Sequence, residues 1–272
     1  MGYTSNDVSI PLSLLPPVQR RYTMPMHPFT ILLIAACATV ATFIGGSLAL
    51  RLRDKLHLIL GFSAGAVIAV AFFDLLPESL ELGSAYHSIA TMLTYTALGF
   101  FAYTVLDRFV TLHTHQDDAD DEVHMHGTPK RAVVGAGSLS GHSFLDGFAI
   151  GLAFQASAAV GAIVAVAVLT HDFSDGINTV NLVLKNGGTR AQAFRWLIAD
   201  AFAPLLGAAA TLFIHVQGGT LSIILAIFAG FFLYIGASDL LPESHHSHPK
   251  ALTTILTLCG AAVLYIAIHI AG

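Results

Sequence analysis

The chain has 272 residues, of which 55% are hydrophobic and only 11% are charged, and its net charge is −5. Soluble domains carry about 25% charged residues, so this composition excludes a soluble globular protein and indicates a membrane protein that crosses the bilayer several times. The small negative charge gives no reason to expect a nucleic-acid partner. Cys37 and Cys259 form no Cys-x-x-Cys pair, so neither a disulfide framework nor a zinc knuckle is indicated.

Residues 1–28 are polar and contain five prolines, which predicts a flexible tail without a cleavable signal peptide. Eight apolar segments follow, each long enough to cross a hydrocarbon core of about 30 Å. They are residues 29–50, 56–77, 86–107, 132–154, 158–184, 193–215, 219–241 and 251–271. The sequence therefore predicts an all-α membrane protein, with a domain of eight transmembrane helices over residues 29–272.

Lysine and arginine residues gather in alternate connections between these segments. The connections after the first, third, fifth and seventh segments hold ten of the 12 basic residues, and the other two are Arg20 and Arg21. Basic residues favour the cytoplasmic side of a membrane. We therefore expect these four connections in the cytoplasm and both chain termini outside.

Two sequence motifs occur twice. Asp-Leu-Leu-Pro-Glu-Ser occupies residues 74–79 and 239–244, where Pro77 and Pro242 are expected to end the second and seventh helices. His-Ser-Phe-Leu-Asp-Gly at 142–147 and His-Asp-Phe-Ser-Asp-Gly at 171–176 lie in the fourth and fifth segments. Since consecutive helices run in opposite directions, the motifs predict inverted repeats, with helices 1–3 matching 6–8 and helix 4 matching helix 5.

Each His/Asp motif places an imidazole and a carboxylate four residues apart, on one face of a helix. The two segments are separated only by residues 155–157, so the motifs should face each other at one depth in the membrane. An ionised Asp at mid-bilayer costs roughly 2.5–3.5 kcal/mol, and a divalent cation is the obvious compensation. The predicted ligands are His142, Asp146, His171, Asp172 and Asp175, and Gly147 and Gly176 should let the two backbones approach closely.

Other polar residues are candidates for an ion path or for accessory roles: Ser143, Asn178, Asp200, Asp74, Asp239, Glu243, His113 and His115. The third connection, residues 110–130, holds four histidines and five acidic residues. It is either a solvated charged loop or a weak metal relay on the cytoplasmic side. The acids beside Pro77 and Pro242 are either helix ends in the membrane interface or stations on the access and exit paths.

The paired His/Asp motifs, the repeated Asp-Leu-Leu-Pro-Glu sequence, the eight helices and the His-rich third connection resemble the ZIP family of divalent metal transporters over residues 29–271. The resemblance implies a metal site halfway across the membrane. The site usually carries zinc, and in some members iron, manganese or cadmium, with no cofactor beyond the transported ion. The five predicted ligands fall on the family's ligand positions.

Several positions depart from the family pattern. Leu145 and Ser174 stand where the family usually has helix-kinking prolines, and Ser143 replaces an asparagine. Ala203, before Pro204, stands where many members have a glutamate that bridges to a second metal. We therefore expect one tightly bound metal ion per chain, with Asp200 on a different level of the sixth helix.

These observations together predict a multi-pass protein of the cell membrane (inner or plasma) that carries Zn²⁺, or a similar divalent ion, into the cytoplasm. Its partners are the ion and the lipid bilayer, and a homodimer is compatible with the sequence. Two alternatives use the same residues. An intramembrane zinc metallohydrolase would activate a water molecule, and a metal-sensing receptor would bind metal without transport. Metal uptake into vesicles and hydrolysis assays separate these readings.

Overall fold

The computed structural model describes residues 28–49, 56–115, 129–245 and 251–271. This part of the chain forms helices joined by short turns and contains no strand, which confirms the all-α part of the predicted fold class. The helices are α2 (Pro28–Ser47), α4 (Leu56–Val70), α5 (Leu76–Gly83), α6 (Ile89–His115), α7 (Pro129–Ala156), α8 (Ala158–Lys185), α9 (Arg190–Thr211), α10 (Gly218–Tyr234), α11 (Leu241–His245) and α12 (Ala251–Ala271). A π-helical turn, η3 (Ala71–Leu75), joins α4 to α5, and another, η5 (Ile235–Leu240), joins α10 to α11.

Seven helical segments of the described chain are long and apolar enough to cross a membrane: Pro28–Ser47, His57–Gly83, Ile89–Arg108, Ala158–Lys185, Arg190–Thr211, Gly218–Ser244 and Ala251–Ile270. The 28-residue helix α7 is not among them, and its sequence includes Lys130, Arg131 and Asp146. Large apolar side chains cover the outer surface, as at Phe101 and Leu258, which are 63% and 65% exposed. Such a surface is stable against lipid and unfavourable against water.

Local sequence signals explain where several helices begin. α2 begins at Pro28, in the first turn where a missing N–H has no cost. Ser157, the single residue between α7 and α8, caps α8 by accepting a hydrogen bond from the Val160 N–H. Thr189 and Gln192 form a capping box at the start of α9.

Three helix ends differ from the sequence-based expectation. Pro77 and Pro242 do not end their helices, since each lies within the short helix, α5 or α11, that follows a π-helical turn. A prolyl ring normally clashes with the carbonyl four residues earlier. The wider π-helical turn just before each proline changes which carbonyl the ring meets, so the helix continues. α6 also continues past the predicted residue 107 to His115, because each further residue of an existing helix adds a hydrogen bond at little cost.

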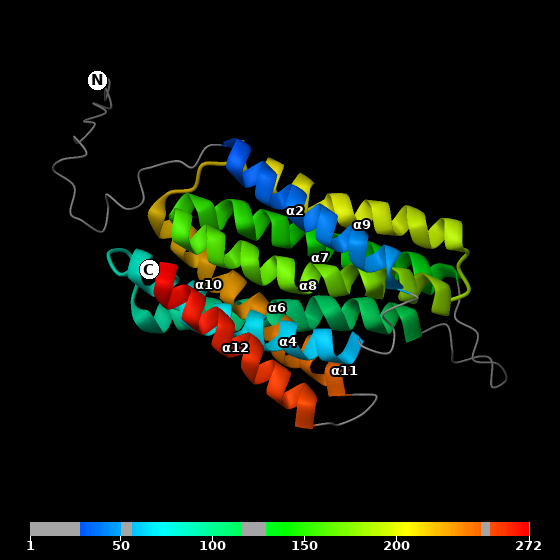
Figure 1. Cartoon of the computed structure of the whole chain (residues 1–272). Coiled ribbons are helices and arrows are strands. Elements are labelled where there is room, and N and C mark those ends of the chain that lie inside the picture. The colour runs from blue at the N-terminus through cyan, green and yellow to red at the C-terminus, as the bar shows by residue number, and fades with distance from the viewer. Residues whose placement is uncertain (1–27, 50–55, 116–128, 246–250, 272) are drawn as a thin grey trace, which may run out of the picture.

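The helices form two bundles that pack against each other (Figure 1). The first bundle contains α2, α7, α8 and α9, with α7 against α8 and α9 and α2 against the same two helices. The second contains α4, α6, α10 and α12, with α4 against α12 and α6 against α10. Contact between the bundles is less extensive and runs mainly through α4 with α8 and α6 with α7.

Gly147 and Gly176 mark close helix contacts, but the prediction that they bring α7 and α8 together is wrong. A Cβ atom at Gly147 would overlap the carbonyl oxygen of Pro204 on α9, and one at Gly176 would overlap that of Thr42 on α2. Each glycine thus fixes its helix against a third helix of the same bundle. A glycine is needed because only a backbone without Cβ approaches so closely.

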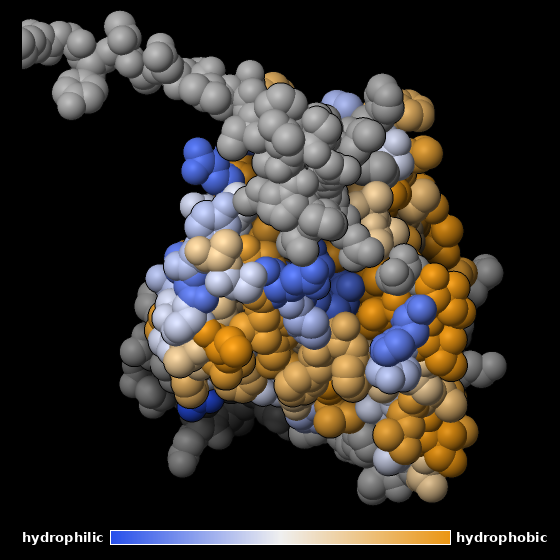
Figure 2. Space-filling model, turned by 90° about the vertical axis from the view of Figure 1, so that its left-hand side faces the viewer, coloured by the Kyte–Doolittle hydropathy of each residue, from blue (hydrophilic) through white to orange (hydrophobic). Residues whose placement is uncertain are grey.

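Helices α2, α6, α8 and α11 end at one end of the molecule, on the right in Figure 1. The turns that follow α5, α7 and α9 lie at the other end. Figure 2 views this second end and shows hydrophilic residues gathered in its middle, with apolar surface around them. A pocket of about 340 Å³ at this end is lined by Tyr86, His87 and Gln217, among others. In the described part of the chain, this end of the molecule thus carries polar surface, while the sides of the molecule are apolar.

Candidate metal site

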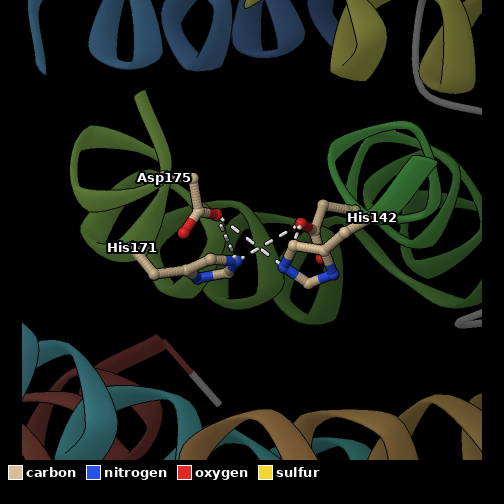
Figure 3. Close-up of side chains that lie close together, drawn as sticks. His142, His171 and Asp175 are labelled. Carbon is tan, nitrogen blue, oxygen red and sulfur yellow. Dashed lines mark hydrogen bonds and ion pairs between the residues drawn. The ribbon is translucent and has the colours of Figure 1, made fainter. Parts of the chain in front are cut away.

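Four predicted ligands converge between α7 and α8. His142 and Asp146 project from α7 and His171 and Asp175 from α8, and one ligand atom from each lies within 4.8 Å of the others. Each pair is one helical turn apart, which puts both side chains on the same face. Figure 3 shows His171 and Asp175 pointing toward His142 on the neighbouring helix.

The site lies at the middle of both helices. His142 and His171 are each the fourteenth residue of a 28-residue helix. The imidazole of His171 and the carboxylates of Asp146 and Asp175 are almost fully buried, with side-chain exposures of 1%, 4% and 6%. The prediction of two facing motifs at one depth is confirmed.

The distances between the ligand atoms suit a small dication. Nε2 of His142 lies 3.2 Å from Oδ2 of Asp146 and 3.7 Å from Oδ2 of Asp175. Nε2 of His171 lies 3.3 and 3.9 Å from the same two oxygens. A tetrahedral zinc ion about 2.0–2.2 Å from each ligand requires ligand atoms about 3.3–3.6 Å apart. Small shifts of the side chains would therefore close the four atoms around one ion.

Hydrogen bonds fix both imidazole rings. Nδ1 of His171 lies 3.0 Å from the carbonyl oxygen of Ala167, which only accepts, so Nδ1 carries a hydrogen, and the neutral ring would offer the Nε2 lone pair to a bound ion. Nδ1 of His142 lies 2.9 Å from the hydroxyl oxygen of Tyr103 on α6. A lone pair facing carboxylate oxygens is stabilised when a cation lies among them.

Asp172, the fifth predicted ligand, lies outside this group of four. It follows His171 directly, and successive helical residues point about 100° apart. Its carboxylate is fully buried, and neither oxygen has a hydrogen-bond partner among the described residues. Burial of such a carboxylate is costly unless a positive charge compensates it. A role for Asp172 near the bound ion therefore stays a prediction.

Asp200 is held by hydroxyl groups. Ser143 on α7 donates to its Oδ1 and Thr179 on α8 donates to its Oδ2, both at 2.8 Å. The carboxylate is fully buried and joins α9 to both helices that carry the ligands. Ser143, a candidate for the path, is thereby used to hold Asp200.

The remaining candidates lie apart from the four-ligand group. Asn178 is half-buried one turn beyond Asp175, and Asp74 is buried in the π-helical turn η3. Asp239 in η5 and Glu243 in α11 are exposed. The side chains of His113 and His115 lie outside the described part, as do residues 116–128 and the tail 1–27.

A cavity lies beside the site. It has a volume of about 370 Å³ and is lined by residues of α6 and α7 that include Tyr103, Asp107, Ser138 and His142. Tyr234 of α10 donates a hydrogen bond of 2.9 Å to Asp107 Oδ2. Sequence reasoning missed these aromatic and acidic neighbours, since isolated residues on distant segments form no pattern along the chain.

A buried group of two imidazoles and two carboxylates amid apolar helices defines an integral, multi-pass membrane protein that binds a divalent metal ion. Residues 112–267 match the family described as ZIP Zinc transporter. This region is more than half of the 272 residues, and the chain belongs to the ZIP family of metal transporters.

Individual relatives agree. The chain is 28% identical over 255 residues to "Zinc transporter ZupT" of Corynebacterium aurimucosum, a match that covers 88% of this chain and 95% of that protein. It is 35% identical over 107 residues to "Zinc transporter ZIP6" of Homo sapiens, covering 39% of this chain and 14% of ZIP6. It is 23% identical over 303 residues to "Zinc transporter SLC39A7" of Mus musculus, covering 80% and 63%. The chain thus spans nearly all of the bacterial relative and a small part of ZIP6.

Proposed function

We propose that this chain carries Zn²⁺, or a similar first-row divalent ion, through the membrane by way of His142, Asp146, His171 and Asp175. The observation that carries the proposal is the convergence of their four ligand atoms within 4.8 Å at the middle of two apolar helices. Membership of a zinc-transporter family supports transport rather than catalysis or sensing.

The donor set favours transition metals over calcium and magnesium. Two imidazole nitrogens and two carboxylate oxygens suit zinc and its neighbours, whereas calcium and magnesium prefer sites made only of oxygen. The two carboxylates neutralise the charge of one dication. Asp172, buried and without a hydrogen-bond partner among the described residues, adds negative potential beside it. Zn²⁺ is the expected cargo, with Cd²⁺, Fe²⁺ and Mn²⁺ as competitors.

An ion must exchange its hydration water for protein ligands before it reaches the buried site. Acidic residues at the two π-helical turns, Asp74 in η3 and Asp239 in η5, and Glu243 in α11 suit this exchange. One oxygen of Asp74, Oδ2, is buried with no hydrogen-bond partner among the described residues, which makes it a ready cation ligand. We propose these groups as stations before and after the central site.

The proposed topology has eight transmembrane helices. We count α7 as the eighth because it has the same length as α8 and packs beside it, although its sequence is less apolar. The matching π-helical turns before Pro77 and Pro242 support the proposed inverted repeat. The ten basic residues in alternate connections of the sequence favour the cytoplasmic side for those connections, with both termini outside and Zn²⁺ moving inward.

The two bundles offer a physical basis for alternating access. The first bundle carries all four ligands. Its helices pack more extensively on one another than on the helices of the second bundle. Rocking of one bundle against the other would expose the site to one side of the membrane at a time. The protein would do this in the cell membrane, surrounded by lipid.

Reconstitution into liposomes tests the proposal. Liposomes that contain the purified protein should take up Zn²⁺ faster than liposomes without protein. Excess Cd²⁺ should compete with this uptake better than excess Mg²⁺ or Ca²⁺. The same preparation should not hydrolyse peptide or lipid substrates faster than a metal-chelated control. Metal binding without uptake would support a receptor, and metal-dependent hydrolysis would support the metallohydrolase.

A further inference from the structure

Tyr103 links the two bundles at the metal site. It lies on α6 of the second bundle, and its hydroxyl oxygen is 2.9 Å from Nδ1 of His142 on α7 of the first bundle. The two rings meet edge to face, with centroids 5.9 Å apart and an interplanar angle of 84°. The contact therefore reaches a proposed ligand from outside the bundle that carries all four.

Aromatic residues of α10 hold the Tyr103 ring in place. Its centroid lies 5.4 Å from that of Phe231 and 5.3 Å from that of Tyr234. Aromatic pairs at such distances are mutually attractive and restrict the ring. The hydroxyl of Tyr103 is thus aimed at His142 by packing within the second bundle.

The hydrogen bond has a chemical consequence for His142. Its Nε2 faces the oxygens of Asp146 and Asp175, so Nε2 must offer a lone pair to a bound ion. A neutral imidazole does this when Nδ1 carries the hydrogen, and that hydrogen then needs an acceptor. The hydroxyl oxygen of Tyr103 is that acceptor.

The two imidazoles differ in where their acceptor lies. Nδ1 of His171 donates to the carbonyl oxygen of Ala167, one turn back on the same helix, and this bond moves with the ligand. Nδ1 of His142 depends on a residue of the other bundle. Of the two rings, only that of His142 has the hydrogen-bond partner of its Nδ1 in the other bundle.

We propose that Tyr103 is a positioning residue that sets the tautomer and orientation of His142, and so raises metal affinity when α6 and α7 are in contact. The inference rests on the proposed function, since it takes His142 as a ligand. Partners that hold a metal-bound histidine typically contribute 10–100-fold to metal affinity. An arrangement of the bundles that separates Tyr103 from His142 should bind the ion more weakly by about that factor.

Tyr103→Phe tests the inference, because it keeps the ring and removes only the hydroxyl. Zinc binding is measured by isothermal titration calorimetry in detergent, and KM and Vmax are measured in liposomes. We expect Kd and KM to rise about 10–100-fold, with a modest fall in the metal-free Tm because Nδ1 of His142 loses its partner. Tyr95→Phe, the matched control on the same helix, should change Kd less than about twofold. An unchanged Kd in Tyr103→Phe would overturn the inference.

A double-mutant cycle separates positioning from a general structural effect. In a His142→Ala background, Tyr103→Phe should cause no further loss of affinity, because there is no ring left to position. An equal further loss would overturn the inference about Tyr103 but not the assignment of the metal site. If His142→Ala alone bound zinc as tightly as the unchanged protein, the proposed site itself would be wrong.

Discussion

Asp200 shows how the surroundings of the site are stabilised at the scale of single residues. Its two oxygens accept hydrogen bonds from Ser143 and Thr179. Thr179→Val keeps the shape of the side chain and leaves one buried oxygen without its donor, which costs about 1–3 kcal/mol. We expect a lower Tm in detergent. Thr94→Val, at an exposed threonine that bonds only its own helix, is the control, and an equal loss in both variants would contradict this reading.

A second residue-scale prediction concerns the number of bound metals. Only four ligand atoms of the described residues converge. The hydroxyl of Ser143 donates a hydrogen bond to Asp200, and the side chain of Ala203 offers no ligand atom. Elemental analysis after equilibration with Zn²⁺ should give about one ion per chain. Ala203→Glu should raise this ratio, with Asp172 as the partner of the new carboxylate. A ratio of two in the unchanged protein would contradict the one-metal prediction.

The sequence was sufficient to predict the four converging residues but not what surrounds them. Spacing of four residues within one helix determines that His142 and Asp146 share a face, and the short link to α8 brings the second pair opposite. Tyr103 and Thr179 could not be found in this way. Their positions depend on how far distant helices are rotated and shifted, and no local pattern encodes that.

At the scale of helices, Gly176 controls the contact between α8 and α2. A Cβ atom there would overlap the carbonyl oxygen of Thr42, which belongs to rigid helix backbone. Gly176→Ala should therefore cost about 1–3 kcal/mol through overpacking, and displace the helix that carries His171 and Asp175. Both Tm and zinc affinity should fall.

Gly137→Ala is the matched control for this prediction. Its Cβ would lie 3.6 Å from Trp196, an ordinary packing distance, and alanine favours a helix by roughly 0.5–1 kcal/mol over glycine. This variant should be as stable as the unchanged protein or more so. Equal stability of Gly176→Ala would show that α2 and α8 can separate freely.

Helix positions were predictable to within a few residues at most ends, because a segment that crosses lipid must stay apolar for about 20 residues. The exceptions lie where sequence signals are ambiguous. Proline usually ends a helix, but a preceding π-helical turn lets the chain continue at Pro77 and Pro242. The two glycines of the His/Asp motifs indicated close packing without indicating the partner.

At the scale of the whole molecule, the distribution of basic residues predicts which end faces the cytoplasm. In a variant without Cys37 and Cys259, a cysteine replacing the exposed Ser84 should react from outside with a membrane-impermeant maleimide. A cysteine replacing Ala119, in the third connection, should react only after the membrane is permeabilised. The opposite labelling pattern would reverse the proposed orientation and the direction of transport.

The division into two bundles was not predictable from the sequence. All eight segments are apolar, so hydrophobicity does not say which helix contacts which. In the structure the four ligands belong to one bundle, and Tyr103 of the other bundle contacts one of them, His142. That separation makes relative motion of the bundles a means of changing both access and affinity.

The most direct test is the rate of Zn²⁺ uptake into liposomes by Asp146→Asn and Asp175→Asn. Each change keeps the size of the side chain and removes a charge that stabilises the buried dication. We predict uptake at the background level of liposomes without protein, from variants whose metal-free Tm is unchanged or higher. Glu81→Gln, at an exposed acid away from the site, should transport normally. Near-normal uptake by either aspartate variant would contradict the assignment of this site.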